Sequence, residues 1–169
     1  ALPSRCRCSA PDGRPHRSGM SHARWRPNVT VAAYIEGPDG LLWVQERSAA
    51  GPRLNNAAGH LELEDASLLD AVCREVWEET GRRFQPLSLL GVYLGEPSGE
   101  LRYLRFAFVG TVGPREREAL APAIIDTLWL SPAQLRGRAA ELRSALVLAF
   151  LADYEAGVRH PLTLLHPLP

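Results

Sequence analysis

The sequence contains no lysine, three cysteines, a single methionine and no net charge. A balanced charge argues against nucleic acid or an anionic membrane as the main partner. The spacing of Cys6, Cys8 and Cys73 fits neither a disulfide framework nor a zinc site, so we expect free thiols in the cytoplasm. No apolar run approaches the roughly 20 residues that a membrane-spanning helix needs, so we expect no membrane partner.

The chain of 169 residues is long enough for one domain, and its 46% hydrophobic content is typical of a globular protein. Residues 1–26 differ from the rest, because they combine many arginines with frequent proline and serine and a single acid, Asp12. We expect this Arg-rich N-terminal segment to be disordered. It is either an organelle transit peptide or translated sequence upstream of Met20, and the second is favoured because no amphipathic pattern is present. The folded domain is predicted over residues 27–165.

Apolar and β-branched patterns predict alternating strands and helices within this domain. A helix is expected from Ser67, a good N-terminal capping residue, to Gly81, a good C-terminal stop. Residues 51–56 are expected to form a loop. The remaining predicted strands are 29–35, 41–45, 87–94, 103–112 and 127–130, and the remaining helices begin at Ser131 and span 141–154. Mixed strands with two or three helices predict an α/β/α sandwich.

Three glutamates gather at the end of the helix predicted from Ser67. Because residues three and four apart share a helix face, Glu75, Glu78 and Glu79 should stand together, with Arg74 one turn away. Like charges at this spacing, at the negative end of the helix dipole, destabilise the helix unless a cation neutralises them. Carboxylate oxygens suit Mg²⁺, which completes its coordination with water and substrate phosphates. We therefore predict a Mg²⁺ site, in which Mn²⁺ can substitute, serving hydrolysis of a phosphate–phosphate bond.

The segment from Gly59 to Gly81 resembles the Nudix box, which ends in Arg-Glu-apolar-x-Glu-Glu-x-Gly. Residues 74–81 match that ending at every position, although Arg82 replaces the apolar residue that usually follows. The resemblance implies a Nudix-type α/β/α sandwich with a mixed sheet and a loop–helix–loop catalytic motif. It also implies the site residues: metal ligands at Gly59 (through neighbouring backbone), Glu75, Glu78 and Glu79, with catalytic roles for Arg74 and the three glutamates.

The first half of the box departs from the family pattern, because the interval from Gly59 to Arg74 is one residue longer. Counting forward from Gly59 places the early glutamate of the pattern at Asp65, and counting backward from Arg74 places it at Ala66. We expect one inserted residue within 63–66. Since the early glutamate supports the box, the insertion is expected to disturb the loop and the support of Arg74.

Short segments in matching order between residues 26 and 165 resemble the phosphatase NudJ branch of this family. Among them are Ala58-Gly59-His60-Leu61-Glu62 and Leu104-Arg105-Phe106. The branch implies hydrolysis of nucleoside di- and triphosphates, and of 4-amino-2-methyl-5-hydroxymethylpyrimidine pyrophosphate, with release of phosphate. Two alternatives are another nucleotide-pool pyrophosphohydrolase and a Nudix-fold binding or regulatory module with reduced turnover. The expected partner is a small phosphorylated substrate, and the protein is expected to be a monomer or homodimer.

Further candidates for the reaction lie outside the box. Glu96, Glu100 and Asp126 are acids that could supply a general base, and Asp126 is ranked first because relatives often carry an acid there. Arg105, on a predicted strand, is expected to contact phosphate, and Asn55 is expected to contact the base of the substrate.

Overall fold

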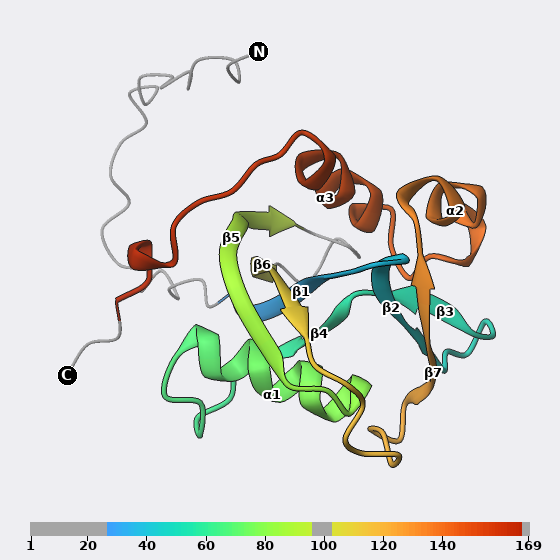
Figure 1. Ribbon diagram of the computed structural model, residues 1–169, viewed down its shortest axis with the longest axis horizontal. Coiled ribbons are helices and arrows are strands. Elements are labelled where there is room, and N and C mark those ends of the chain that lie inside the picture. Colours follow the sequence, from blue (N-terminus) through green and yellow to red (C-terminus); the bar gives the residue numbers. More distant parts are fainter. Residues whose placement is uncertain (1–26, 96–102, 167–169) are drawn as a thin grey trace, which may run out of the picture.

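A central mixed sheet with helices on both faces forms the domain in the computed structural model, which describes residues 27–95 and 103–166 (Figure 1). The predicted disordered segment 1–26 and the candidate acids Glu96 and Glu100 lie outside the described residues. The strands are β1 (Asn28–Gly37), β2 (Gly40–Glu46), β3 (Arg53–Asn55), β4 (Ala57–His60), β5 (Phe84–Gly95), β6 (Tyr103–Val112) and β7 (Ile124–Leu130). The α-helices are α1 (Leu68–Thr80), α2 (Pro132–Gly137) and α3 (Leu146–Glu155), and two short 3₁₀ helices span Ala139–Glu141 and Leu162–Leu164.

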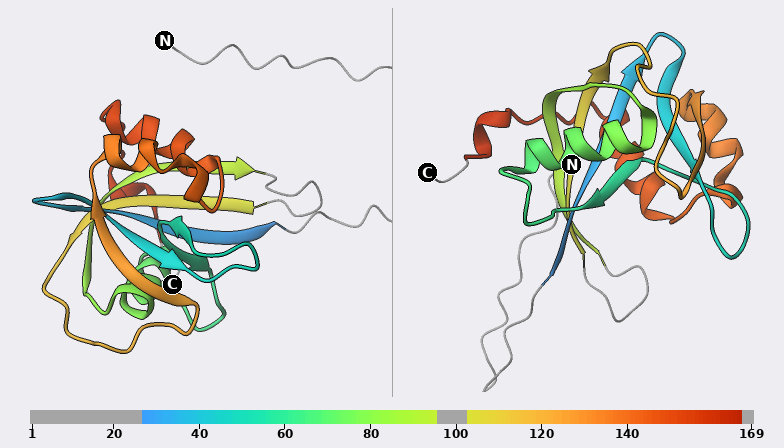
Figure 2. Two further views of the ribbon diagram at one scale, coloured as in Figure 1. Left: turned by 90° about the vertical axis from the view of Figure 1, so that its right-hand side faces the viewer. Right: turned by 90° about the horizontal axis from the view of Figure 1, so that it is seen from below.

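The strand β1 lies in the middle of the sheet and organises the layers. Its Val31, Ala33 and Ile35 side chains belong to the core beneath α1, whereas Tyr34 belongs to the core beneath α2 and α3. This alternation is the period of two that a strand buried on both faces requires. Figure 2 shows the resulting layers, with α1 on one face of the sheet and α2 and α3 on the other. The predicted α/β/α sandwich is confirmed.

Two different strands share one edge of β1, and this arrangement opens the sheet. Along the other edge, β6 pairs in parallel with β1 from Asn28 to Glu36. On the shared edge, β4 pairs with Thr30–Ala33 of β1, whereas β2 pairs with Ile35–Gly37. The strands β2 and β4 therefore diverge from the same edge of β1, and the loop and short strand that join them lie beside the opening.

The helix predicted at Ser67–Gly81 is confirmed as α1, and its two ends are fixed locally. The Ser67 hydroxyl accepts a hydrogen bond from the backbone N–H of Asp70 at 3.1 Å. Gly81 takes a left-handed conformation (φ 66°), which glycine adopts without steric cost, and a Cβ there would lie 2.2 Å from the carbonyl oxygen of Arg117. The last turn of α1, which carries Glu78 and Glu79, is consequently held in one position.

Two predictions of local structure are wrong. Residues 51–56 are not only loop, because Arg53–Asn55 forms β3 against β2, and the following Ala57–His60 forms β4. The last long helix begins at Leu146 and not at Glu141, because Leu142 is extended and bridges to Leu54. The backbone N–H of Arg143 donates to the Leu54 carbonyl at 2.9 Å, which holds this segment against β3 instead of in a helix. None of the described helices is long and apolar enough to cross a membrane.

Candidate active site

Arg74 lies on α1 at the centre of a network of hydrogen bonds that fixes the glycine-containing loop. Its Nε and Nη2 donate to the two carboxylate oxygens of Asp65, each at 2.9 Å, in a bidentate pair. Nη2 also donates to the His60 carbonyl at 2.9 Å, and Nη1 donates to Glu75 Oε1 at 2.7 Å. The expected disturbance of the support of Arg74 by the longer loop is therefore not found.

The extra residue of the box lies after Asp65. Counting forward from Gly59 therefore gives the position of the acid that supports Arg74. A turn closes from Glu62 to Asp65, in which the Asp65 N–H donates to the Glu62 carbonyl at 3.2 Å and the Glu62 N–H donates to Asp65 Oδ2 at 2.9 Å. The hydrogen bonds from Arg74 hold the pKa of the Asp65 carboxyl below its ordinary value. Asp65 thus meets Arg74 as an ion, and the additional residue lies between Asp65 and the start of α1.

The glutamates at the end of α1 meet the backbone of β4 at Gly59. The carboxylate of Glu75 lies so close that a Cβ on Gly59 would be 2.2 Å from Glu75 Cδ. Glu79 accepts a hydrogen bond from the Ala58 N–H at 2.9 Å. Burial raises the pKa of Glu75, and it raises the pKa of Glu79 to about 8 against the opposing effect of the Ala58 hydrogen bond. Two carboxylates are thus held in a setting that disfavours their charge.

Glu78 lies on the more open side of this group. Its side chain is 43% exposed, and its carboxylate is 3.6 Å from Arg74 Nη1. Within residues 27–95 and 103–166, no three acidic, histidine or cysteine side chains converge closely enough to hold a metal as they stand. Glu75 instead accepts a hydrogen bond from Arg74, and Glu79 accepts one from the backbone N–H of Ala58. Their predicted role as metal ligands stays a prediction.

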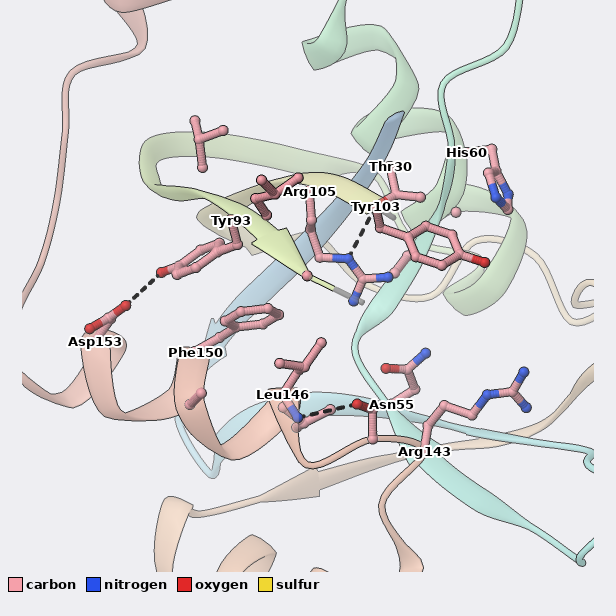
Figure 3. A pocket seen from close by; sticks show the side chains of 18 of the residues that line it. Thr30, Asn55, His60, Tyr93, Tyr103, Arg105, Arg143, Leu146, Phe150 and Asp153 are labelled. Atoms are coloured by element: carbon pink, nitrogen blue, oxygen red, sulfur yellow. Dashed lines mark hydrogen bonds between the residues drawn. The ribbon is translucent and has the colours of Figure 1, made fainter. Parts of the chain in front are cut away.

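A pocket of about 840 Å³ lies beside Gly59, between the sheet and α3 (Figure 3). Its wall includes Ala58, Gly59 and His60 of β4, so the pocket begins where the glutamates of α1 meet the sheet. Aromatic and apolar side chains from β5, β6 and α3 form much of the remainder, including Tyr93, Tyr103, Leu146 and Phe150. A pocket with an apolar wall and a few polar groups is the usual shape of a small-molecule site.

The two residues predicted to contact substrate, Asn55 and Arg105, both line this pocket. Arg105 comes from β6, and its Nε donates to Thr30 Oγ1 at 3.2 Å, which is its one hydrogen bond to another side chain in the described part of the chain. Figure 3 shows the remaining guanidinium nitrogens directed into the open space of the pocket. Burial lowers the pKa of Arg105, so an anionic ligand would offset an electrostatic cost already present in the protein.

Asp126 is not brought to the pocket. It lies on β7 opposite Gln45 of β2, is exposed, and accepts a hydrogen bond from the Thr127 N–H at 2.7 Å. It is absent from the lining of the pocket formed by the described residues. Its predicted role as a general base therefore gains no support from its position.

Glu46 and Arg143 are among the polar residues of the pocket wall that the sequence did not predict. Glu46 ends β2, and Arg143 follows the extended Leu142. Arg143 Nη1 and Glu46 Oε2 are 3.9 Å apart. In the sequence each resembles an ordinary solvated charge at the end of an element. Only the divergence of β2 from β4 and the displaced start of α3 place them at the pocket.

Comparisons with known proteins show what the chain is similar to. A family model for the NUDIX domain matches residues 26–150. The phosphatase NudJ of Escherichia coli (strain K12) is 33% identical over 147 residues, and the match covers 83% of this chain and 92% of that protein.

Solved structures give the same result at the level of the fold. A NUDIX hydrolase from Nitrosomonas europaea is 41% identical, with a TM-score of 0.77, over 83% of this chain and 97% of that chain. A bifunctional NMN adenylyltransferase/ADP ribose pyrophosphatase from Francisella tularensis, complexed with AMP and a Mn ion, has a TM-score of 0.60. It is 17% identical and covers 78% of this chain and 42% of that chain, so it shows a shared fold only.

Proposed function

The chain belongs to the Nudix hydrolase family, and from this premise we propose that it is a Mg²⁺-dependent phosphohydrolase of the NudJ type. Its proposed substrates are nucleoside di- and triphosphates and 4-amino-2-methyl-5-hydroxymethylpyrimidine pyrophosphate, from which it releases phosphate. We propose that it acts in the cytoplasm as a monomer or homodimer. The observation that carries the proposal is the contact of Glu75 with Gly59, a residue that also lines the pocket to which Arg105 belongs.

The chemistry of the donor groups fits a divalent cation. Burial has raised the pKa of Glu75 and Glu79, and a cation nearby would stabilise their charged forms. Glu75, Glu78, Glu79 and the backbone next to Gly59 would hold it, after Glu75 and Glu79 turn from their present partners. When bound, the cation supplies charge neutralisation at the phosphate oxygens and lowers the pKa of the attacking water.

The protein's own residues then have separate roles in the reaction. Arg74, fixed by Asp65, positions Glu75 and the loop that carries Gly59. Arg105 binds the phosphate chain through the guanidinium nitrogens that face the pocket. We assign the general base to one of the helix glutamates and not to Asp126, because Asp126 is exposed and outside the pocket lining.

Phosphate release from a panel of nucleotides and the pyrimidine pyrophosphate tests this proposal. We expect release with Mg²⁺, none with a chelator, and a kcat lower by about 100-fold or more in Glu78→Gln. Because Glu78 is 43% exposed, its substitution should leave the core intact. Glu118→Gln, at a side chain that is 95% exposed, is the matched control.

Each contrary outcome has a distinct meaning. No metal-dependent release from any member of the panel would refute the enzymatic proposal in favour of a binding or regulatory module. Release of pyrophosphate in place of phosphate would indicate a nucleotide-pool pyrophosphohydrolase of the same family.

A further inference from the structure

Four pocket residues form one row across the sheet, and this row gives the pocket two ends. His60 of β4 pairs with Thr30 of β1, which also pairs with Arg105 of β6. Arg105 in turn pairs with Tyr93 of β5, and all four residues line the pocket. Since neighbouring strands lie about 4.8 Å apart, the row is about 14 Å long. A ligand on this row extends from β4, beside the glutamates of α1, toward β5.

The β4 end of the row carries the groups that suit phosphate. Glu75 contacts Gly59 there. Burial lowers the pKa of Arg105, and Glu46 and Glu79 are among the charges that oppose this effect, so both carboxylates lie near the guanidinium. A divalent cation at the glutamates and the charge of Arg105 would together hold the phosphates. The remainder of the ligand then lies farther along the row.

The β5 end of the row has an aromatic and apolar wall with one acid. Leu146, Phe150 and Asp153 of α3 are four and three residues apart, so they share a helix face, and all three line the pocket. The rings of Phe150 and Tyr93 are in contact, with centroids 4.1 Å apart. The Tyr93 hydroxyl donates to Asp153 Oδ2 at 2.9 Å (Figure 3). Such a wall suits a planar heterocycle better than a phosphate.

Asp153 has one carboxylate oxygen that a ligand can reach. Burial, together with the Asp153 carboxylate, raises the pKa of Tyr93, so the hydroxyl stays protonated and donates to Oδ2. The other oxygen, Oδ1, accepts no hydrogen bond from the described residues. It is not among the fully buried oxygens without a partner, and Asp153 is only half-buried, so Oδ1 keeps accessible surface. A carboxylate oxygen accepts only, so its partner in a ligand is a donor.

We propose that the heterocycle of the substrate lies at the β5 end and that Asp153 selects rings with an exocyclic amino group. The amino group of cytosine or adenine donates to Asp153 Oδ1, whereas the carbonyl of uracil would place an acceptor against an acceptor. Asn55, for which the sequence predicts a contact with the base, is the competing position. It follows Leu54, whose carbonyl accepts from the Arg143 N–H on another part of the wall. The inference rests on the proposed function, because it requires phosphates at the β4 end.

Pairs of substrates that differ at the amino group test the inference. We expect kcat/KM for CDP to exceed that for UDP by about 10- to 100-fold, the factor that a hydrogen bond to a charged group is worth. ADP should exceed purine riboside diphosphate, which lacks only the amino group, in the same direction. A ratio near one for both pairs in the wild-type protein would overturn the inference.

Variants separate recognition by Asp153 from a general loss of structure. Asp153→Asn can still accept from Tyr93, but its amide can donate to a carbonyl, so the CDP/UDP ratio should fall at least 10-fold. The ratio is measured within each variant, so partial loss of folded protein cancels. Asp39→Asn, the same substitution at an exposed residue outside the pocket lining, should keep the wild-type ratio.

Two results with these variants would contradict the role of Asp153. If Asp153→Asn lowers both rates equally, the residue has a structural role only. If Asn55→Ala removes the preference for CDP while Asp153→Asn retains it, the ring lies at the competing position.

Binding of the monophosphates keeps this test apart from the proposed function. If the wild-type protein releases no phosphate, the proposed hydrolysis fails, yet CMP and UMP binding can still be compared by calorimetry. Tighter binding of CMP, lost in Asp153→Asn, would support recognition by Asp153 without turnover. Equal affinity, or no binding of either nucleotide, would overturn it.

Discussion

Two arginines on opposite faces of the sheet show how differently one side chain can be used. Arg74, on the α1 face, meets Asp65 with two hydrogen bonds and also contacts His60 and Glu75. Arg105, on the α3 face, donates to Thr30 and otherwise faces the pocket. Arg74 is satisfied within the protein and acts as a positioning residue. Arg105 has guanidinium N–H groups directed into the pocket, as a residue that binds an external anion would.

Because of this difference, we expect changes at Arg74 and its partners to affect stability, and changes at Arg105 to affect substrate binding. Removing a group whose partners are all in the protein leaves buried acceptors unpaired and should lower the free energy of unfolding. Removing a charged group whose partner is a ligand should weaken binding and leave the folded state unharmed, because burial of that charge was already unfavourable. Substitutions around the two arginines test both the expected change in stability and the expected change in binding.

Among substitutions near the two arginines, the largest effect is expected from Gly59→Ala, because Gly59 contacts Glu75 and also lines the pocket. The new Cβ would lie 2.2 Å from the end of the Glu75 side chain, which must move away. Because a flexible side-chain end moves and no backbone does, we expect little change in Tm. A displaced carboxylate should lower kcat by about 100-fold.

Gly113→Ala is the control for that experiment, because a Cβ there meets no atom within 4 Å. Activity should be retained in this variant. If Gly59→Ala keeps full activity, the placement of Glu75 does not matter for the reaction and the assignment of this helix end is wrong.

A smaller effect is expected from Arg105→Gln on the pocket side. Loss of a charged donor to phosphate should raise KM by about 10-fold with a smaller change in kcat. Thermal unfolding should show an unchanged or slightly higher Tm, since a charge disfavoured by burial is removed. A lower Tm with unchanged KM would make Arg105 a structural residue like Arg74 and remove the contrast.

The smallest effect on activity is expected from Asp65→Asn. Half of the bidentate pair with Arg74 weakens, so the free energy of unfolding should fall by about 1–2 kcal/mol and kcat by only a few-fold. Chemical denaturation measures the first quantity, and Glu64→Gln on the exposed part of the same loop is the control.

The pH dependence of that variant gives an independent check. Because the pKa of Asp65 is lowered in the folded state, its stabilisation is present above the ordinary pKa of about 4 and is lost as pH falls through the folded value. The stability gap between wild type and Asp65→Asn should therefore close on acidification. A gap that stays constant down to pH 2 would contradict the ion pair.

The parts of the molecule that could be predicted from the sequence are those fixed by neighbouring residues. Helix α1 was predicted with both ends because Ser67 and Gly81 act on the turns next to them. The divided edge of β1 was missed, since Ala57–His60 becomes a strand only by pairing with Thr30–Ala33. The start of α3 was misplaced for a similar reason, because the contact of Leu142 with distant Leu54 overrides the local helical pattern.

The candidate site also has residues that the local sequence predicts and residues that only the folded chain brings to the pocket. The glutamates and Arg74 follow from helix periodicity and the family motif, and the sequence also predicts Asn55 and Arg105, which the fold brings to one pocket. Sequence spacing alone left Asp65 and Ala66 as equal candidates to support Arg74, and the direction of one side chain decides between them. Glu46 gives no local signal, because its burial in the pocket wall, without a partner for Oε1 among the described residues, arises only in the folded chain.

The turn from Glu62 to Asp65 also bears on how members of this family are recognised. It closes on itself before α1 begins, so the short stretch behind Asp65 can change in length while the Asp65 carboxylate stays opposite Arg74. A motif search that demands a fixed interval across this stretch would reject the present chain although the ion pair is intact. Searches that let the interval vary there, and require an acid on the forward count, would recover homologues of this kind.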